Sequence, residues 1–117
     1  IQLSEMMSPL FLHEEAYDFI ARATQHWAES RQAEYDSAGY THKIEIWDDV
    51  KRRWNRSGRA YRRLADALSS SQKYPDAVWA SADHFLRGQD YSSALEALDN
   101  FIATMNAGDA DGHACAC

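Results

Sequence analysis

Residues 46–68 read IWDDVKRRWNRSGRAYRRLADAL, and this stretch decides the fold class. At about 100° per residue on a helical wheel, its apolar residues fall on one face and four of its arginines fall on the opposite face. The apolar face is Trp47, Val50, Trp54, Gly58, Tyr61, Ala65 and Leu68, and the basic stripe is Arg52, Arg56, Arg59 and Arg63. Such a separation is typical of an amphipathic helix. We therefore predict a long helix that Thr41 caps and that ends near Ser70.

Helix signals also dominate the rest of the chain. Pro9 follows the capping hydroxyl of Ser8, and Asp90 can cap a later helix. No segment alternates apolar and polar residues over the length of a strand. We predict an all-α fold of two long and two short helices, antiparallel because the loops are short. The predicted helices span about 9–38, 41–70, 75–87 and 90–108, in a single domain of residues 1–117 with an N-terminal arm at 1–8 and a polar tail at 109–117.

The last two predicted helices carry a recognisable pattern. Residues 87–98 read RGQDYSSALEAL, with Ala94 at a position for close helix packing and Leu98 four residues later. Residues 77–106 resemble a single tetratricopeptide repeat, with Ala82 and Phe85 at the small and aromatic positions of its first helix. Ser81 departs from the repeat, which usually has leucine there. Because a solenoid usually needs at least about three repeats, we interpret this segment as one helical hairpin.

The charge is segregated along the chain. The protein has 18 acidic and 12 basic residues, a net charge of −6, yet seven of the basic residues and no acid lie within residues 51–63. The overall acidity argues against a globally basic nucleic-acid-binding protein. The basic stripe itself leaves three interpretations open. It pairs with carboxylates of the first helix (Glu14, Asp18 and Glu29), or it binds an acidic protein partner, or it binds a nucleic-acid backbone.

The aromatic face of the same predicted helix has two possible interpretations. Trp47 and Trp54 belong to the core, or they join the four arginines in a partner-binding surface, since Trp and Arg are enriched at binding hot spots. Gly58 costs about 1 kcal/mol in a helix, so it marks a close approach of another backbone. That approach is a helix crossing or, with Tyr61, a contact in a homodimer. We expect a homodimer because two long helices leave apolar surface uncovered.

No pattern of catalytic residues is present, so we predict no enzymatic activity and no cofactor. The tail residues His113, Cys115 and Cys117 offer one imidazole and two thiols to a soft metal, but no further ligand completes a known spacing, so we predict no metal site. Residues 1–20 lack a basic segment followed by an apolar stretch, which leads us to expect a cytoplasmic protein without a membrane partner.

One further resemblance concerns the chain as a whole. Its length, its acidity, the opening LSEMMSPLFL at residues 3–12 and the segment IWDDVKRRW at residues 46–54 resemble the small bacterial quorum-sensing anti-activators of the QslA family. This resemblance implies a helical protein that binds the ligand-binding domain of a LuxR-type transcription factor and blocks its dimerisation. It carries no functional residues over, because no motif places them.

Overall fold

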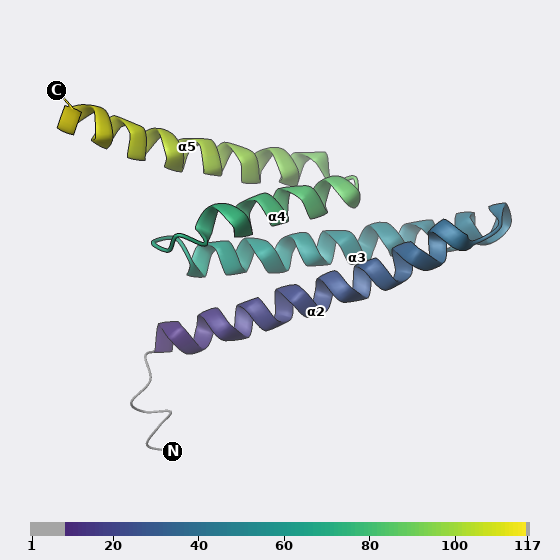
Figure 1. The fold of residues 1–117 in the computed structure, drawn as a ribbon. Coiled ribbons are helices and arrows are strands. Elements are labelled where there is room, and N and C mark those ends of the chain that lie inside the picture. The colour runs from purple at the N-terminus through teal and green to yellow at the C-terminus, as the bar shows by residue number, and fades with distance from the viewer. Residues whose placement is uncertain (1–8, 117) are drawn as a thin grey trace, which may run out of the picture.

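The computed structural model describes the backbone of residues 9–116 and the side chains of residues 14–106. Within this part the chain forms helices and no strand. The helices are α2 (Pro9–Ser37), α3 (Tyr40–Ala67), α4 (Tyr74–Arg87) and α5 (Tyr91–Ala116) (Figure 1). The predicted all-α fold is therefore confirmed. No described helix combines the length and the apolar character needed to cross a membrane.

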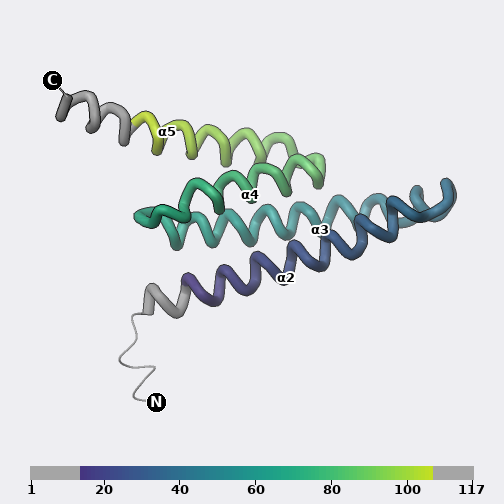
Figure 2. Tube along the Cα trace, in the orientation of Figure 1, coloured from purple at the N-terminus to yellow at the C-terminus, as the bar shows by residue number. Residues whose placement is uncertain are grey.

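The four helices form a single layer. Each packs on the one before it, α2 with α3, α3 with α4 and α4 with α5, as the Cα trace shows (Figure 2). The molecule measures 60 × 46 × 18 Å and has a radius of gyration of 17.7 Å. A compact domain of this length has a radius of gyration of about 13 Å. The layer is thus little more than one helix thick, and both of its faces are open.

Small residues bring α2 and α3 together. Ala21 and Ala28, seven residues apart on one face of α2, are both 0% exposed. Around Ala28 lie Ile46, Val50 and Trp54 of α3. Because alanine adds little beyond the backbone, the larger side chains of α3 can pack directly against the α2 surface.

The crossing of α3 and α4 combines a glycine with buried polar groups. A Cβ atom at Gly58 would lie 2.8 Å from Cδ1 of Phe85, closer than real Cβ contacts come. Ser81 Oγ donates a 2.8 Å hydrogen bond to the Gly58 carbonyl, and Ser57 Oγ lies 2.8 Å from His84 Nδ1. The hydroxyl of Ser81 thus has a hydrogen-bond partner in this buried crossing, where the side chain of leucine would have no hydrogen bond to offer.

The turn between α4 and α5 also packs on α3. The side-chain amide of Asn55 donates to the Gly88 carbonyl at 3.1 Å, and no Cβ fits at Gly88 because the Lys51 carbonyl oxygen would be 2.8 Å away. Asp90 caps α5 as predicted, because its carboxylate accepts hydrogen bonds from the backbone N–H of Ser93 at 3.1 Å and from its hydroxyl.

Two predicted helix boundaries are wrong. Thr41 does not cap α3, because Gly39 occupies the N-cap position in an extended conformation and its carbonyl accepts from the Lys43 N–H at 2.9 Å. The last helix does not end at Gly108 but continues to Ala116 through the segment predicted as a polar tail. Glycine weakens a helix by only about 1 kcal/mol, and no proline follows to stop it. Ser8 and the predicted arm at 1–8 lie outside the described residues.

Candidate functional site

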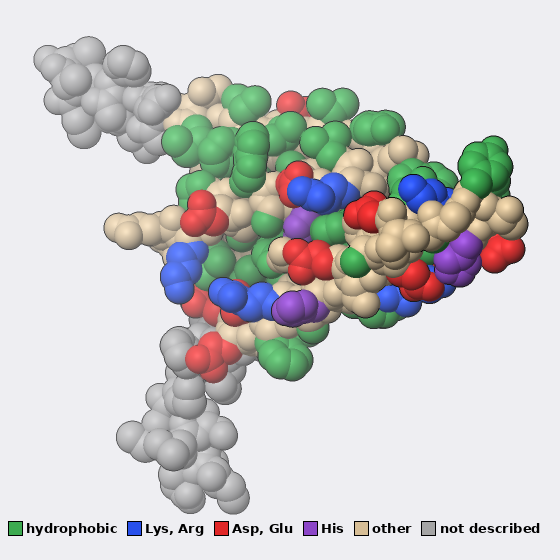
Figure 3. Space-filling model, turned by 45° about the vertical axis from the view of Figure 1, so that its right-hand side comes forward, with side chains coloured by type: hydrophobic (Ala, Val, Ile, Leu, Met, Phe, Trp, Pro, Cys, Tyr) green, Lys and Arg blue, Asp and Glu red, His purple; other side chains and the backbone are tan. Residues whose placement is uncertain are grey.

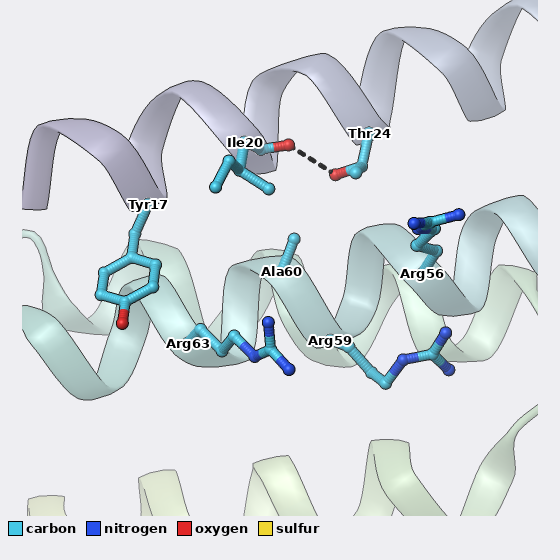
Figure 4. Close-up of a pocket in the computed structure, with 7 residues that line it drawn as sticks. All are labelled: Tyr17, Ile20, Thr24, Arg56, Arg59, Ala60 and Arg63. Atoms are coloured by element: carbon cyan, nitrogen blue, oxygen red, sulfur yellow. Dashed lines mark hydrogen bonds between the residues drawn. The ribbon is translucent and has the colours of Figure 1, made fainter. Parts of the chain in front are cut away.

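A groove of about 320 Å³ lies between α2 and α3 on one face of the layer. Three arginines of the predicted basic stripe line it on the α3 side, and residues of mixed polarity line it on the α2 side (Figure 4). We call this the basic groove, and it is formed by Tyr17, Ile20, Thr24, Arg56, Arg59, Ala60 and Arg63. The structure therefore places three of the four arginines of the predicted basic stripe in one groove.

The α2 wall of the basic groove carries one exposed aliphatic side chain. Ile20 is 47% exposed there, although it is a large hydrophobic residue. The Thr24 hydroxyl donates to the Ile20 carbonyl at 2.9 Å, so its polar atom is already engaged within the helix. Arg56 reaches from α3 toward α2, whereas Arg59 and Arg63 lie over α3 (Figure 4). The groove thus offers an exposed aliphatic side chain beside a row of cations.

The arginines of the basic groove differ from the other arginines in their pairing. Among the described side chains, no carboxylate lies within salt-bridge distance of Arg56, Arg59 or Arg63, although each of the other six arginines has one. Arg52, the fourth residue of the stripe, is exposed and pairs with Asp49 at 3.4 Å. The positive charge of the groove is therefore not neutralised by the described part of the chain.

Among the described side chains, none of the three α2 carboxylates suggested as partners of the basic stripe forms a salt bridge with it. Asp18 pairs with Arg22 on its own helix at 2.9 Å, and Glu29 accepts a hydrogen bond from Gln25 at 3.2 Å. Glu14 makes no salt bridge within the described side chains. Pairing with α2 therefore does not account for the basic stripe.

Trp27 is a residue of this surface that the sequence analysis missed. The guanidinium carbon of Arg53 lies 4.1 Å from the centre of the Trp27 ring, and that of Arg56 lies 5.6 Å away. Arg53 also donates to the Trp27 carbonyl at 3.0 Å. Because cations are attracted to the face of an indole ring, Trp27 holds both side chains over α2. Trp27 follows Ile20 by seven residues and therefore lies on the same face of α2, which is the sequence feature that could have identified it.

The aromatic residues of α3 lie away from the basic groove, toward the opposite face of the layer. Trp54 is buried, and its indole N–H donates to the side-chain oxygen of Gln32 at 2.9 Å. Trp47 is half-buried against Tyr35, with ring centres 5.0 Å apart. Both are therefore core residues in this structure. Only the arginines of the predicted partner-binding set remain on an open surface.

The predicted dimer contacts also have partners within the chain. Gly58 is buried against Phe85, which agrees with its alternative interpretation as a helix crossing. The Tyr61 hydroxyl donates to the side-chain oxygen of Gln25, and burial raises the pKa of Tyr61. Gly58 is buried, whereas Tyr61 is partly exposed, so its role as a contact between copies stays a prediction.

A second groove, of about 310 Å³, lies between α2 and α4 with Trp54 among its lining residues. His84 lines it, and this histidine is nearly inaccessible and packs between the rings of Trp54 and Tyr61, each with its centre 5.0 Å away. Burial lowers the pKa of His84, because desolvation disfavours the imidazolium. Its Nδ1 is occupied by Ser57, and that serine is fully buried. This hydrogen-bonded pair lies at the crossing of α3 and α4.

Within the described side chains, no cluster of histidine, cysteine and acidic residues could hold a metal ion. His113, Cys115 and Cys117 lie outside the described side chains. No protein-family model, no curated protein and no solved structure matches the chain.

Proposed function

We propose that this protein is a regulatory interaction module that binds an acidic surface of a protein partner through the basic groove. The observation that carries this proposal is that three arginines of the groove, Arg56, Arg59 and Arg63, have no carboxylate partner among the described side chains and lie beside the exposed Ile20. Unpaired guanidinium groups next to an exposed aliphatic side chain suit a partner surface that combines carboxylates with apolar side chains. A binder of this kind needs complementarity and no catalytic group.

The partner we propose is a LuxR-type quorum-sensing transcription factor. Support for it comes from the resemblance of residues 3–12 and 46–54 to quorum-sensing anti-activators. Arg56 and Arg63 are seven residues apart, or about 10 Å along α3, so the row of three arginines matches about two turns of a partner helix. By occupying such a surface the protein would prevent two copies of the factor from dimerising.

Charge reversal of the basic groove tests the proposal. We expect Arg56→Glu/Arg59→Glu/Arg63→Glu to weaken binding to a purified LuxR-type ligand-binding domain at least about a hundredfold by titration calorimetry, since each reversal replaces an attraction with a repulsion. The matched control is Arg22→Glu/Lys73→Glu/Arg87→Glu, which changes the net charge equally at exposed positions outside the groove. Circular dichroism verifies the helix content of both variants. Equal loss of binding in the control and the test variant would contradict the assignment of the groove.

Nucleic acid is the second candidate ligand, because the same unpaired arginines could contact phosphates. The discriminating measurement is fluorescence anisotropy with labelled duplex DNA and single-stranded RNA between 50 and 200 mM salt. Over this range, duplex binding through three phosphate contacts falls by about fortyfold. We expect no binding to either probe. Binding with that salt dependence, lost in the groove variant, would replace the protein partner with nucleic acid.

A further inference from the structure

The last helix is covered on one side only. α5 packs on α4, and its buried residues are the small Ala94 and Ala97. Beside them runs a row of larger apolar residues at alternating spacings of four and three, which is the heptad spacing of a helix that packs along another helix. We call this row the α5 seam, and its members are Tyr91, Leu95, Leu98, Ile102 and Met105.

The α5 seam is open in a single chain. Four of its members, all except the partly buried Leu98, are 46–61% exposed. Trp79 and Leu86 of α4, seven residues apart on one face, are exposed to a similar degree. The space-filling view shows apolar side chains gathered over α5 and the adjoining part of α4 (Figure 3). α5 is the helix at the edge of the layer opposite to α2, and we call the four exposed seam residues together with Trp79 and Leu86 the apolar edge.

The size of this edge can be compared with what a dimer requires. Trp79, Leu86 and the four exposed seam residues each have a surface of about 200 Å² and expose about half of it, which gives roughly 600–700 Å². A standard protein interface buries about 800 Å² on each partner. The apolar edge therefore supplies most of an interface before any neighbouring atoms are counted.

We propose that the α5 seam is the self-association surface of this protein, and that its occupant is the α5 seam of a second copy. The seam residues themselves are apolar, and the charged residues of the described part of α5 beside them are Glu96, which pairs with Arg62, and Asp99. A second copy is the occupant that the area favours, because its identical apolar face supplies the matching half of an interface. Two copies related by a two-fold axis bury identical faces against each other. Pairing through this edge also leaves the basic groove, between α2 and α3, open on each copy.

Analytical ultracentrifugation of the full chain tests the seam. We expect the wild type to sediment at twice the 13.3 kDa of one chain. Leu95→Glu/Ile102→Glu should sediment as a monomer, with a dissociation constant at least about a hundredfold higher, because the dimer would bury unpaired carboxylates. Both positions are more than half exposed, so circular dichroism should show an unchanged fold.

The matched control is Phe19→Glu/Ile44→Glu, which places the same charges at equally exposed apolar positions on α2 and α3. We expect this control to remain a dimer. A wild type that is monomeric at all concentrations would overturn the proposal, and so would a control that dissociates while the seam variant does not. Raising the salt concentration should leave the dimer intact, since no ion pair holds it, whereas binding through the basic groove should weaken. A dimer that salt dissociates would contradict an apolar seam.

Discussion

Replacing Gly58 with alanine tests whether this glycine serves a crossing inside the chain. The new Cβ would lie 2.8 Å from Cδ1, 2.9 Å from Cγ and 3.0 Å from Cε1 of Phe85. The Phe85 ring is 1% exposed and cannot move aside without displacing its neighbours. Gly58→Ala should therefore strain the α3–α4 packing and leave the basic groove intact.

The magnitude follows from two opposing effects. Overpacking a filled core costs about 1–3 kcal/mol. Alanine in place of glycine within a helix returns about 1 kcal/mol of helix propensity. The net destabilisation should be about 1 kcal/mol in the free energy of unfolding. Phe85→Leu shortens the obstructing side chain, so in that background Gly58→Ala should become neutral or stabilising, with a coupling of about 1–3 kcal/mol between the two positions.

A double-mutant cycle measures this coupling. The free energy of unfolding of the wild type, both single variants and the double variant is obtained from urea unfolding followed by circular dichroism at 222 nm. Gly39→Ala is the control, because a Cβ at Gly39 meets nothing within 4 Å and its φ of −73° suits any residue. Additive effects of the two substitutions would refute the role of Gly58 in the α3–α4 crossing. So would a Gly58→Ala variant that is more stable than the wild type by the whole gain in helix propensity, about 1 kcal/mol. Loss of the dimer in Gly58→Ala without loss of stability would instead return Gly58 to a contact between copies.

Further outcomes are expected elsewhere in the chain. Gly88→Ala should lower the free energy of unfolding by about 2–3 kcal/mol in the same urea assay, because its Cβ would collide with the Asn55 side chain and the α3 backbone; a change below about 0.5 kcal/mol would contradict this. The lowered pKa of His84 stabilises the fold fully above the unfolded value of about 6.5, and this stabilisation is lost as the pH falls toward the folded value. Urea midpoints between pH 8 and pH 5 should therefore fall less steeply in His84→Gln than in the wild type or in the exposed control His26→Gln, and an identical slope would refute the assignment. Trp27→Ala should weaken partner binding about tenfold with little change in unfolding, because Arg53 and Arg56 lose their cation–π contacts; unchanged affinity by calorimetry would remove Trp27 from the surface.

The sequence by itself determined the local structure. Apolar spacing, Pro75 and the Asp90 cap defined the first three helices and the start of the fourth to within a few residues, because these signals act over one or two helical turns. The same spacing showed that the four arginines of the basic stripe share a face opposite the aromatic residues. The boundaries failed where the local signals were weak. Gly39 took the cap expected of Thr41, and Gly108 alone was not enough to end α5.

Tertiary structure decided which helix faces are covered. A helical wheel shows that Trp54 and Leu95 both lie on apolar faces, but it does not say what packs against them. In the structure Trp54 lies in the core beside α2, whereas Leu95 lies on the open side of α5. The unpaired state of Arg56 likewise depends on carboxylates far away in the sequence, which pair within α2. Which helix face is buried and which charged side chains form ion pairs depend on the neighbouring helices, so both are decided only when the helices pack into the layer.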